Sequence, residues 1–182
     1  MEQSTHQCGG ERRGFLKKAC AIVLGSVAGL LPALAGLRVF FDPLRRGAAK
    51  SSMTFVATLQ SLPEDGAPMK FRVIADRTDA WNRTPQVPIG AVYLRKTGEK
   101  TVKAFNVVCP HAGCFVDYRP EKQGYHCPCH NSTFALDGKL SDPKSPSPRG
   151  LDELDVELRN DGEVWVRFQN YLAGRQERIP VS

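Results

Sequence analysis

The sequence predicts a small all-β domain carried behind one N-terminal membrane helix. An uncharged apolar run occupies residues 19–37, which is long enough for a helix to cross a bilayer. After residue 54, short runs rich in β-branched and aromatic residues alternate with Pro and Gly turns, and no stretch keeps a helical period for three turns. The 182 residues hold one domain of about 130 residues and a short extra segment, which excludes a large multidomain enzyme.

The net charge of +6 is concentrated near the N-terminus. Residues 11–50 carry eight basic and two acidic side chains, whereas the rest of the chain is close to neutral. Basic flanks around an apolar run are typical of a membrane segment. A nearly neutral domain argues against a nucleic-acid-binding surface.

Residues 1–18 are predicted to form an N-terminal tail that carries an export signal. The first ten residues are polar and glycine-rich, and we expect them to be disordered. Residues 11–17 read Glu-Arg-Arg-Gly-Phe-Leu-Lys, which resembles the twin-arginine export signal. An ordinary basic flank of a membrane helix explains the charges but not the Phe-Leu pair at that offset. Cys8 and Cys20 have no predicted role beyond packing or lipid contact.

Residues 19–41 are predicted to be a retained, single-pass transmembrane anchor. The uncharged part would reach roughly 28 Å, close to the thickness of a bilayer core, and the apolar residues 39–41 continue it past Arg38, which can snorkel. A cleaved signal peptide is the alternative, because residues 33–35 read Ala-Leu-Ala. More basic residues precede the run than follow it, which favours an N-terminus inside the cell.

Residues 42–53 are mostly small or polar and are predicted to be a hinge or linker. The β domain then extends over residues 54–182. The final two strands flank Asn160-Asp161-Gly162 and predict a β-hairpin. Pro and Gly residues at 62–66 and 85–90 are predicted to separate strands. We expect strands at residues 55–59, 69–74, 91–95, 102–108, 154–158 and 164–168.

Four of the six cysteines and two of the four histidines lie in two short segments. The first segment, residues 109–114, reads Cys-Pro-His-Ala-Gly-Cys, and the second, residues 127–130, reads Cys-Pro-Cys-His, with 15 residues between His111 and Cys127. Thiolates and imidazoles on loops rich in Pro and Gly favour zinc or an iron–sulfur cluster. A closed zinc site needs only four ligands, so it would leave two thiols unexplained.

These two segments resemble the cluster-binding motifs of the Rieske iron–sulfur family, in the form found in quinol–cytochrome c oxidoreductases. The resemblance implies one [2Fe–2S] cluster per chain, with two cysteines on one iron and two histidines on the other. The matching ligands are Cys109, His111, Cys127 and His130. It also implies a disulfide between the remaining cysteines of the segments, Cys114 and Cys129. The fold it implies is a Rieske-type antiparallel β-sheet domain with an inserted cluster-binding subdomain, whose loops cover about residues 107–150.

The sequence departs from the family pattern after the second segment. The family usually shows Gly-Ser-x-Tyr where residues 131–134 read Asn-Ser-Thr-Phe. Ser132 keeps the hydroxyl expected to donate a hydrogen bond to a cluster sulfur, but Phe134 cannot donate where a Tyr would, and fewer donors lower the reduction potential. Residues 145–150 resemble the proline loop that shields the cluster. We expect His126 to be a surface or packing residue.

The ligand set implied by the resemblance suits quinol oxidation. Two neutral imidazoles in place of two thiolates raise the potential far above that of all-Cys ferredoxins, so that quinol can be the donor. Each imidazole also keeps a ring nitrogen that can accept a proton. The resemblance makes His130, together with His111, the contact for quinol and the proton acceptor, with His130 as the better candidate.

The resemblance therefore implies the membrane-anchored Rieske subunit of a quinol–cytochrome c oxidoreductase, a redox subunit active only within its complex. It would take electrons from quinol at a cytochrome b-type subunit and pass them to a c-type cytochrome, with release of protons. The expected location is the bacterial cytoplasmic membrane with the domain on the periplasmic side, where a disulfide persists. The alternatives are the small Rieske subunit of another exported oxidoreductase, such as arsenite oxidase, and a colourless structural zinc-binding module. The sequence leaves open whether the donor is ubiquinol or menaquinol.

Overall fold

The computed structural model describes residues 10–42, 52–78 and 82–181. The chain divides into two compact units, Met1–Ala49 and Lys50–Ser182. The predicted disordered tail and most of the predicted hinge, at residues 1–9 and 43–51, lie outside the described residues. The two units are described separately below.

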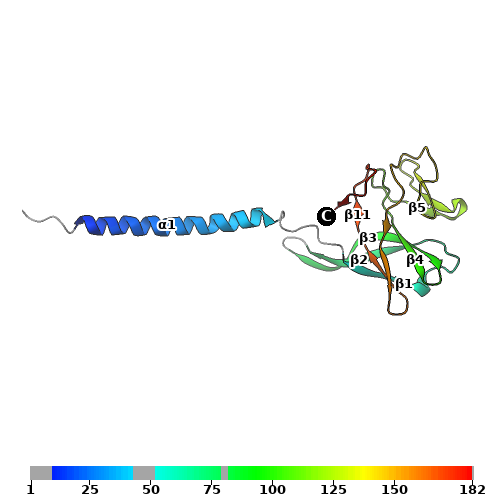
Figure 1. Cartoon of the computed structure of the whole chain (residues 1–182), viewed down its shortest axis with the longest axis horizontal. Helices are drawn as coiled ribbons and strands as arrows, with labels where there is room; N and C mark the ends of the chain where they lie inside the picture. The colour runs from blue at the N-terminus through cyan, green and yellow to red at the C-terminus, as the bar shows by residue number, and fades with distance from the viewer. Residues whose placement is uncertain (1–9, 43–51, 79–81, 182) are drawn as a thin grey trace, which may run out of the picture. The chain divides into compact units, whose positions relative to one another are not determined.

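The first unit is built on one long helix, α1 (Gly10–Phe40), of 31 residues (Figure 1). The helix begins before the predicted anchor at residue 19 and includes the basic residues that precede the apolar run. Its segment Arg13–Phe40 is long and apolar enough to cross a membrane. Large apolar side chains such as Leu31 and Phe40 are exposed along it, and lipid is the environment in which such a surface is stable.

The second unit contains two larger antiparallel sheets. One has the strand order β2-β3-β4-β8, formed by β2 (Met69–Thr78), β3 (Arg83–Gly98), β4 (Thr101–Asn106) and β8 (Glu153–Leu154). The other has the order β1-β10-β9, formed by β1 (Met53–Thr58), β10 (Glu163–Arg167) and β9 (Val156–Arg159). A short 3-10 helix, η1 (Leu59–Ser61), follows β1.

The predicted hairpin near residue 160 is confirmed. Strands β9 and β10 pair antiparallel, with Glu163 opposite Arg159. Asn160 and Asp161 have φ values of 44° and 57°, the left-handed conformation that a tight hairpin turn requires and that Asn and Asp tolerate.

The aliphatic core is built from the inner faces of these two sheets. Leu94 and Val92 of β3 and Val164 and Val166 of β10 are fully buried and belong to one hydrophobic cluster. Gly90 leaves room for a neighbouring ring, because a Cβ at this position would lie 2.1 Å from Cζ of Phe168. Burial alternates along β10, whereas β3 and β4 each contain a run of three buried residues, and both patterns are typical of strands.

Two strand predictions need correction. Residues 85–90, predicted to be a turn, form part of the 16-residue strand β3. The pairing with β2 shifts register twice in this region, and Pro88 pairs with Ile74 at one shift, where irregular pairing accommodates a residue that lacks an N–H. The predicted strand at 154–158 divides at Asp155: Leu154 pairs with Ala104 in one sheet, and Val156 pairs with Val166 in the other.

A third, smaller sheet has the order β5-β6-β7, formed by β5 (Asp117–Arg119), β6 (Gly124–His126) and β7 (Thr133–Ala135). The 3-10 helix η2 (Pro120–Lys122) connects β5 to β6. A two-stranded pair, β11 (Asn170–Tyr171) and β12 (Pro180–Val181), lies near the C-terminus. Within this unit β5 and β1 lie at opposite ends (Figure 1), so the small sheet forms a separate subdomain.

The small sheet has its own hydrophobic core. Tyr125 of β6 and Phe134 of β7 are buried in it together with Phe105 from β4. The same cluster contains Cys109 and Cys127. The second core therefore connects the small sheet with the two Cys- and His-containing segments.

Candidate metal centre

The first segment, here called loop 1 (residues 109–114), folds back on itself directly after β4. The Cys109 N–H donates to the Cys114 carbonyl over 2.6 Å, and the Gly113 N–H donates to the Cys109 carbonyl over 3.0 Å. Gly113 has φ = 81°, a conformation that favours glycine. Loop 1 is thus a closed turn with a cysteine at each end.

The second segment and the two residues that follow it, here called loop 2 (residues 127–132), connect β6 to β7. Its ends are joined by the Cys127 N–H, which donates to the Ser132 carbonyl over 2.8 Å. Asn131 has φ = 59°, which explains why the position that is Gly in the resembling family accepts Asn. A ring nitrogen of His126 lies 3.2 Å from Asn131 Oδ1, so His126 has a partner at the edge of this loop.

A disulfide between Cys114 and Cys129 joins the two loops. Their Cα atoms are 6.6 Å apart, and the bond closes a separation of 15 residues. The disulfide predicted from the resemblance is therefore confirmed. It also fixes loop 1 beside loop 2.

The two predicted histidines lie against each other. The ring centroids of His111 and His130 are 4.7 Å apart, and the planes cross at 84°. His130 is exposed, whereas His111 is partly buried. The Nδ1 atom of His111 is buried and has no hydrogen-bond partner among the described residues. One imidazole therefore faces solvent, and the other has an unused ligand atom inside the protein.

The two remaining cysteines of the loops are buried as free thiols. Burial raises the pKa of the Cys109 thiol, and the adjacent Cys127 raises it further, while the backbone N–H of His111 and the hydroxyl of Ser132 act in the opposite direction. The Ser132 hydroxyl oxygen is also buried, and it has no partner at normal hydrogen-bond geometry among the residues that the structure describes. Two neighbouring buried sulfurs and two unsatisfied polar atoms are what a bound metal–sulfur group would use.

The chemistry of the donors decides which group fits. The sulfur atoms of Cys114, Cys127 and Cys129 lie within 4.8 Å of one another, but the disulfide uses two of them, so these three cannot act together as thiolate ligands. Two thiols and two imidazoles remain for a metal, at Cys109, Cys127, His111 and His130. This mixed donor set fits a [2Fe–2S] cluster with His on one iron.

The fold and the donor set together define an iron–sulfur domain built on antiparallel sheets. Residues 52–156 match the Rieske [2Fe–2S] domain, and the chain belongs to this family. Its cofactor is a [2Fe–2S] cluster. Helix α1 also has the length and composition to cross a bilayer, as a membrane-anchored member of the family would need.

Two relatives extend the match beyond the domain. The menaquinol:cytochrome c reductase iron–sulfur subunit of Geobacillus thermodenitrificans is 31% identical over 159 residues, which cover 85% of this chain and 89% of the relative. The cytochrome b6-f complex iron–sulfur subunit of Prochlorococcus marinus (strain NATL1A) is 26% identical over 153 residues, covering 82% of this chain and 81% of the relative. Among solved structures, a cyanobacterial plasma membrane Rieske protein from Synechocystis has a TM-score of 0.42 at 21% identity, over 64% of this chain and 99% of that protein.

Sequence reasoning missed two contributors to the site. Asn106, at the end of β4, is buried and accepts a hydrogen bond from the Val108 N–H over 3.0 Å. A C-terminal segment, residues 169–178, reaches loop 1 through the Gly174 N–H, which donates to the Pro110 carbonyl over 2.8 Å. The Gly174 contact has no local motif, because it joins backbone groups far apart in the sequence. The Asn106 contact spans only two residues, so an Asn at the end of a strand is a local signal for it.

Proposed function

We propose that this protein is the Rieske subunit that transfers electrons from quinol to a c-type cytochrome, coupled to proton release. The observation that carries the proposal is the pair of imidazoles, one of them exposed, beside two buried free thiols on disulfide-linked loops. The Geobacillus relative, which aligns over most of both chains, is a menaquinol:cytochrome c reductase subunit, and this similarity supports the proposal.

In this proposal Cys109 and Cys127 hold one iron as thiolates, and His111 and His130 hold the other. When bound, the cluster supplies one-electron redox chemistry at a potential raised by the two neutral imidazoles. The loops hold these four side chains in place through the disulfide and the backbone hydrogen bonds that close each turn. The protein's own task is therefore to hold the ligands and to exclude water from the sulfurs.

The exposed ring of His130 is the proposed contact for quinol. A solvent-facing ring nitrogen can accept a hydrogen bond from the quinol hydroxyl and then hold its proton. His111 is partly buried beside it and is the second candidate for this role. The Ser132 hydroxyl, buried near Cys109, is proposed to donate to a cluster sulfur.

The proposed partners are a cytochrome b-type subunit, where quinol binds, and a c-type cytochrome. The proposed location is the bacterial cytoplasmic membrane with the β domain on the periplasmic side. Support comes from the disulfide, which needs an oxidising compartment, and from the membrane-spanning length of α1. The proposed division of the chain keeps residues 1–18 as the signal-bearing tail, 19–41 as anchor, 42–53 as hinge and 54–182 as the Rieske domain.

Menaquinol is the proposed electron donor. Phe134 is buried in the core that contains Cys109 and Cys127, and its ring offers no hydroxyl to a ligand sulfur. One missing donor lowers the potential, which suits a donor of lower potential. The Geobacillus relative, a menaquinol:cytochrome c reductase subunit, supports this choice.

A visible and electron paramagnetic resonance spectrum of the purified chain, with iron and sulfide analysis, tests the proposal. We expect a Rieske-type signal with two irons per chain in the wild type, its complete loss in Cys109→Ser and His130→Ala, and its retention in the control Cys20→Ser, a free exposed cysteine in α1. A colourless wild-type protein that contains zinc would overturn the proposal. A cluster signal that survives in Cys109→Ser would overturn the ligand assignment alone.

Export and retention of the anchor are tested in cells. Replacing Arg12 and Arg13 by Lys should leave the β domain inaccessible to external protease, because the twin-arginine route needs both arginines. Lys17→Arg with Lys18→Arg is the matched control and should leave export unchanged. Wild-type exposure of the double Arg variant would contradict the signal, and a mature chain lacking residues 1–35 would favour another exported oxidoreductase.

A further inference from the structure

The C-terminal segment 169–178, here called the strap, lies against loop 1. Its Gly174 N–H donates to the Pro110 carbonyl over 2.8 Å. Gly174 has φ = 72°, and a Cβ added there would lie 3.6 Å from the carbonyl oxygen of His111. The strap therefore meets loop 1 at Pro110 and His111, through a backbone hydrogen bond.

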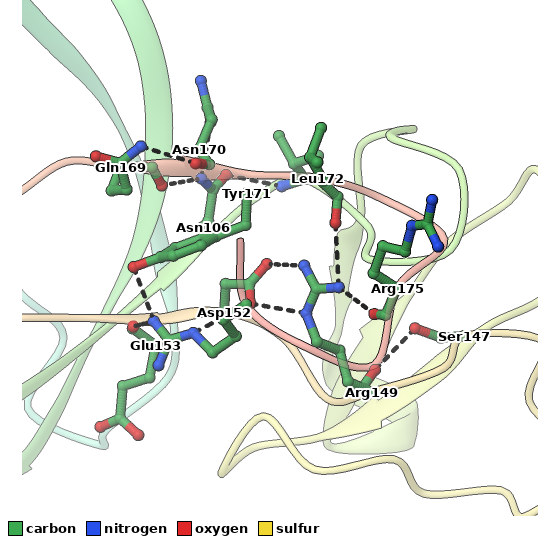
Figure 2. Close-up of polar contacts among 12 residues, drawn as sticks. Asn106, Ser147, Arg149, Asp152, Glu153, Gln169, Asn170, Tyr171, Leu172 and Arg175 are labelled. Atoms are coloured by element: carbon green, nitrogen blue, oxygen red, sulfur yellow. Dashed lines mark hydrogen bonds and ion pairs between the residues drawn. The ribbon is translucent and has the colours of Figure 1, made fainter. Parts of the chain in front are cut away.

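A buried arginine fixes the middle of the strap. Arg149 donates through Nη1 to the carbonyls of Leu172, over 3.2 Å, and of Arg175 (Figure 2). The other edge of its guanidinium bonds both carboxylate oxygens of Asp152, over 3.0 and 2.8 Å. Only 10% of the Arg149 side chain and 5% of the Asp152 side chain are exposed. Such a buried pair needs nearly all its hydrogen-bonding groups satisfied to be stable, and the strap carbonyls supply the missing acceptors.

The strap is also held at both of its ends. Asn106 donates to the Gln169 carbonyl and to Asn170 Oδ1, each over 2.9 Å (Figure 2). Arg178 lies 3.4 Å from Asp152 Oδ1 and stacks on the Tyr171 ring, 4.6 Å from its centroid. Asn106 accepts in turn from the Val108 N–H, in the connection between β4 and loop 1. The strap therefore has one fixed conformation relative to the base of loop 1.

We propose that the strap is a positioning element for the cluster: held by Arg149, it fixes the Pro110–His111 peptide group of loop 1 through the Gly174 N–H. This inference rests on the proposed role of Cys109 as a cluster ligand. The Pro110 carbonyl and the His111 N–H belong to the same peptide plane, so a hydrogen bond at the carbonyl sets the direction of the N–H and polarises it.

The direction of that N–H matters because its peptide group lies between two proposed ligands, Cys109 and His111, where a backbone N–H can donate to a ligand sulfur. A donor that stabilises negative charge on a ligand sulfur stabilises the reduced cluster and raises its potential. Release of the strap should therefore lower the potential while leaving all four ligands in place. Arg149, Asn106 and Gly174 are thus positioning residues, since none of them is a proposed ligand.

The main test is redox titration of the cluster signal in Arg149→Gln combined with Asp152→Asn, a pair that leaves no unpaired buried charge. We expect wild-type iron content, a downward shift of the midpoint potential, and faster amide hydrogen exchange at residues 170–176. Arg175→Gln is the matched control on the strap: it keeps the carbonyl that Arg149 uses, and we expect no shift. An unchanged potential together with accelerated exchange of the strap would overturn the proposal.

A second pair of variants isolates the single hydrogen bond. Gly174→Pro removes the N–H, whereas Gly174→Ala keeps it, and both disturb the same left-handed backbone position. We expect a larger downward shift of potential in Gly174→Pro than in Gly174→Ala, at equal iron content. Equal shifts would show that the Gly174 N–H is not what sets the potential, and cluster loss with an unchanged potential in the remaining cluster would show that the strap acts on stability alone. Absence of a Rieske signal in the wild type would instead defeat the proposed function.

Discussion

The two hydrophobic cores of the β domain are composed differently. The first, between the larger sheets, is mainly aliphatic and buries residues such as Val73, Leu94 and Val164 completely. The second, under the small sheet, combines aromatic rings with the two free cysteines. The longest strand at the first core has 16 residues, whereas the three strands of the small sheet have three residues each.

Buried polar atoms also lie around the second core. Ser132 Oγ, His111 Nδ1 and the Tyr125 hydroxyl are buried without a hydrogen-bond partner among the described residues. A buried polar atom without a partner costs about 1–3 kcal/mol. The comparison teaches that the larger sheets are stable through apolar burial, whereas the cluster-binding subdomain depends on a disulfide, on the strap and on its bound group.

The largest change in stability should come from the first core. Leu94→Ala removes a fully buried side chain and should lower the free energy of unfolding by about 2–5 kcal/mol. Urea denaturation followed by circular dichroism measures it. Met69→Ala, at the exposed residue paired with Leu94, is the control and should change stability far less. An equal loss of stability in the two variants would contradict the view that aliphatic burial stabilises this region.

Removal of the disulfide should act on the second region alone. Cys114→Ser with Cys129→Ser opens a loop of 15 residues and should lower stability by about 3 kcal/mol in the chain-entropy model. Hydrogen exchange should accelerate at residues 109–135 and stay slow in β3 and β10. Loss of protection throughout both sheets would show that the two cores are not separable in this way.

The Tyr125 hydroxyl allows a smaller test that depends on pH. Burial raises the pKa of the Tyr125 phenol, the charge of Arg95 opposes this effect, and Tyr93 and Tyr118 add to it. The group therefore adds no pH-dependent penalty below the unfolded pKa of about 10, and it lowers stability increasingly as the pH rises beyond that value, because the unfolded state ionises first.

Tyr125→Phe should therefore raise stability by about 1 kcal/mol at neutral pH and should reduce the loss of stability above pH 10. Tyr118→Phe, at a partly buried neighbour, is the control. Denaturation of the three proteins at pH 7 and at pH 10.5 checks both points. A destabilised Tyr125→Phe at neutral pH would mean that the hydroxyl has a partner in the loaded protein.

The smallest expected effect is a change of potential within the second core. Phe134→Tyr should raise the midpoint potential by restoring a donor near a ligand sulfur, by less than about 59 mV, which corresponds to a tenfold change for one electron. Ser132→Ala should lower it. Redox titration at a single pH below the histidine titration compares them. No upward shift in Phe134→Tyr with an intact cluster would show that position 134 does not face the sulfur.

The sequence predicted the first region better than the second because their signals differ. Leu94 and Val164 lie in segments of five or more residues that contain runs of β-branched, aromatic and other apolar residues, which is a strong local signal. Strands of three residues, such as the one that contains Tyr125, carry almost no periodicity and exist through tertiary pairing. The prediction of a turn around Pro88 was wrong, because a register shift in the strand pairing allows a proline within the strand.

The candidate site was predictable in its residues but not in its support. The spacing of Cys109, His111, Cys127 and His130 is visible in the sequence. The contacts of Arg149 with backbone carbonyls 23 and 26 residues away have no counterpart in any local pattern. Backbone acceptors are the same for every residue type, so the strap could be found only from the structure.

The division of residues 153–159 between two sheets has a consequence for folding cooperativity. Leu154 pairs with Ala104, and two residues later Val156 pairs with Val166, so a single short stretch of chain is an edge strand of both sheets. If this stretch leaves one sheet, its pairing in the other sheet is disturbed as well. This coupling favours one unfolding transition over two. Ala104 lies in β4, which precedes loop 1. The strand at the base of loop 1 should therefore stay folded until that common transition. Chemical denaturation monitored by tryptophan fluorescence from Trp165 and by the cluster absorbance would then show how much earlier the loops release than the sheets.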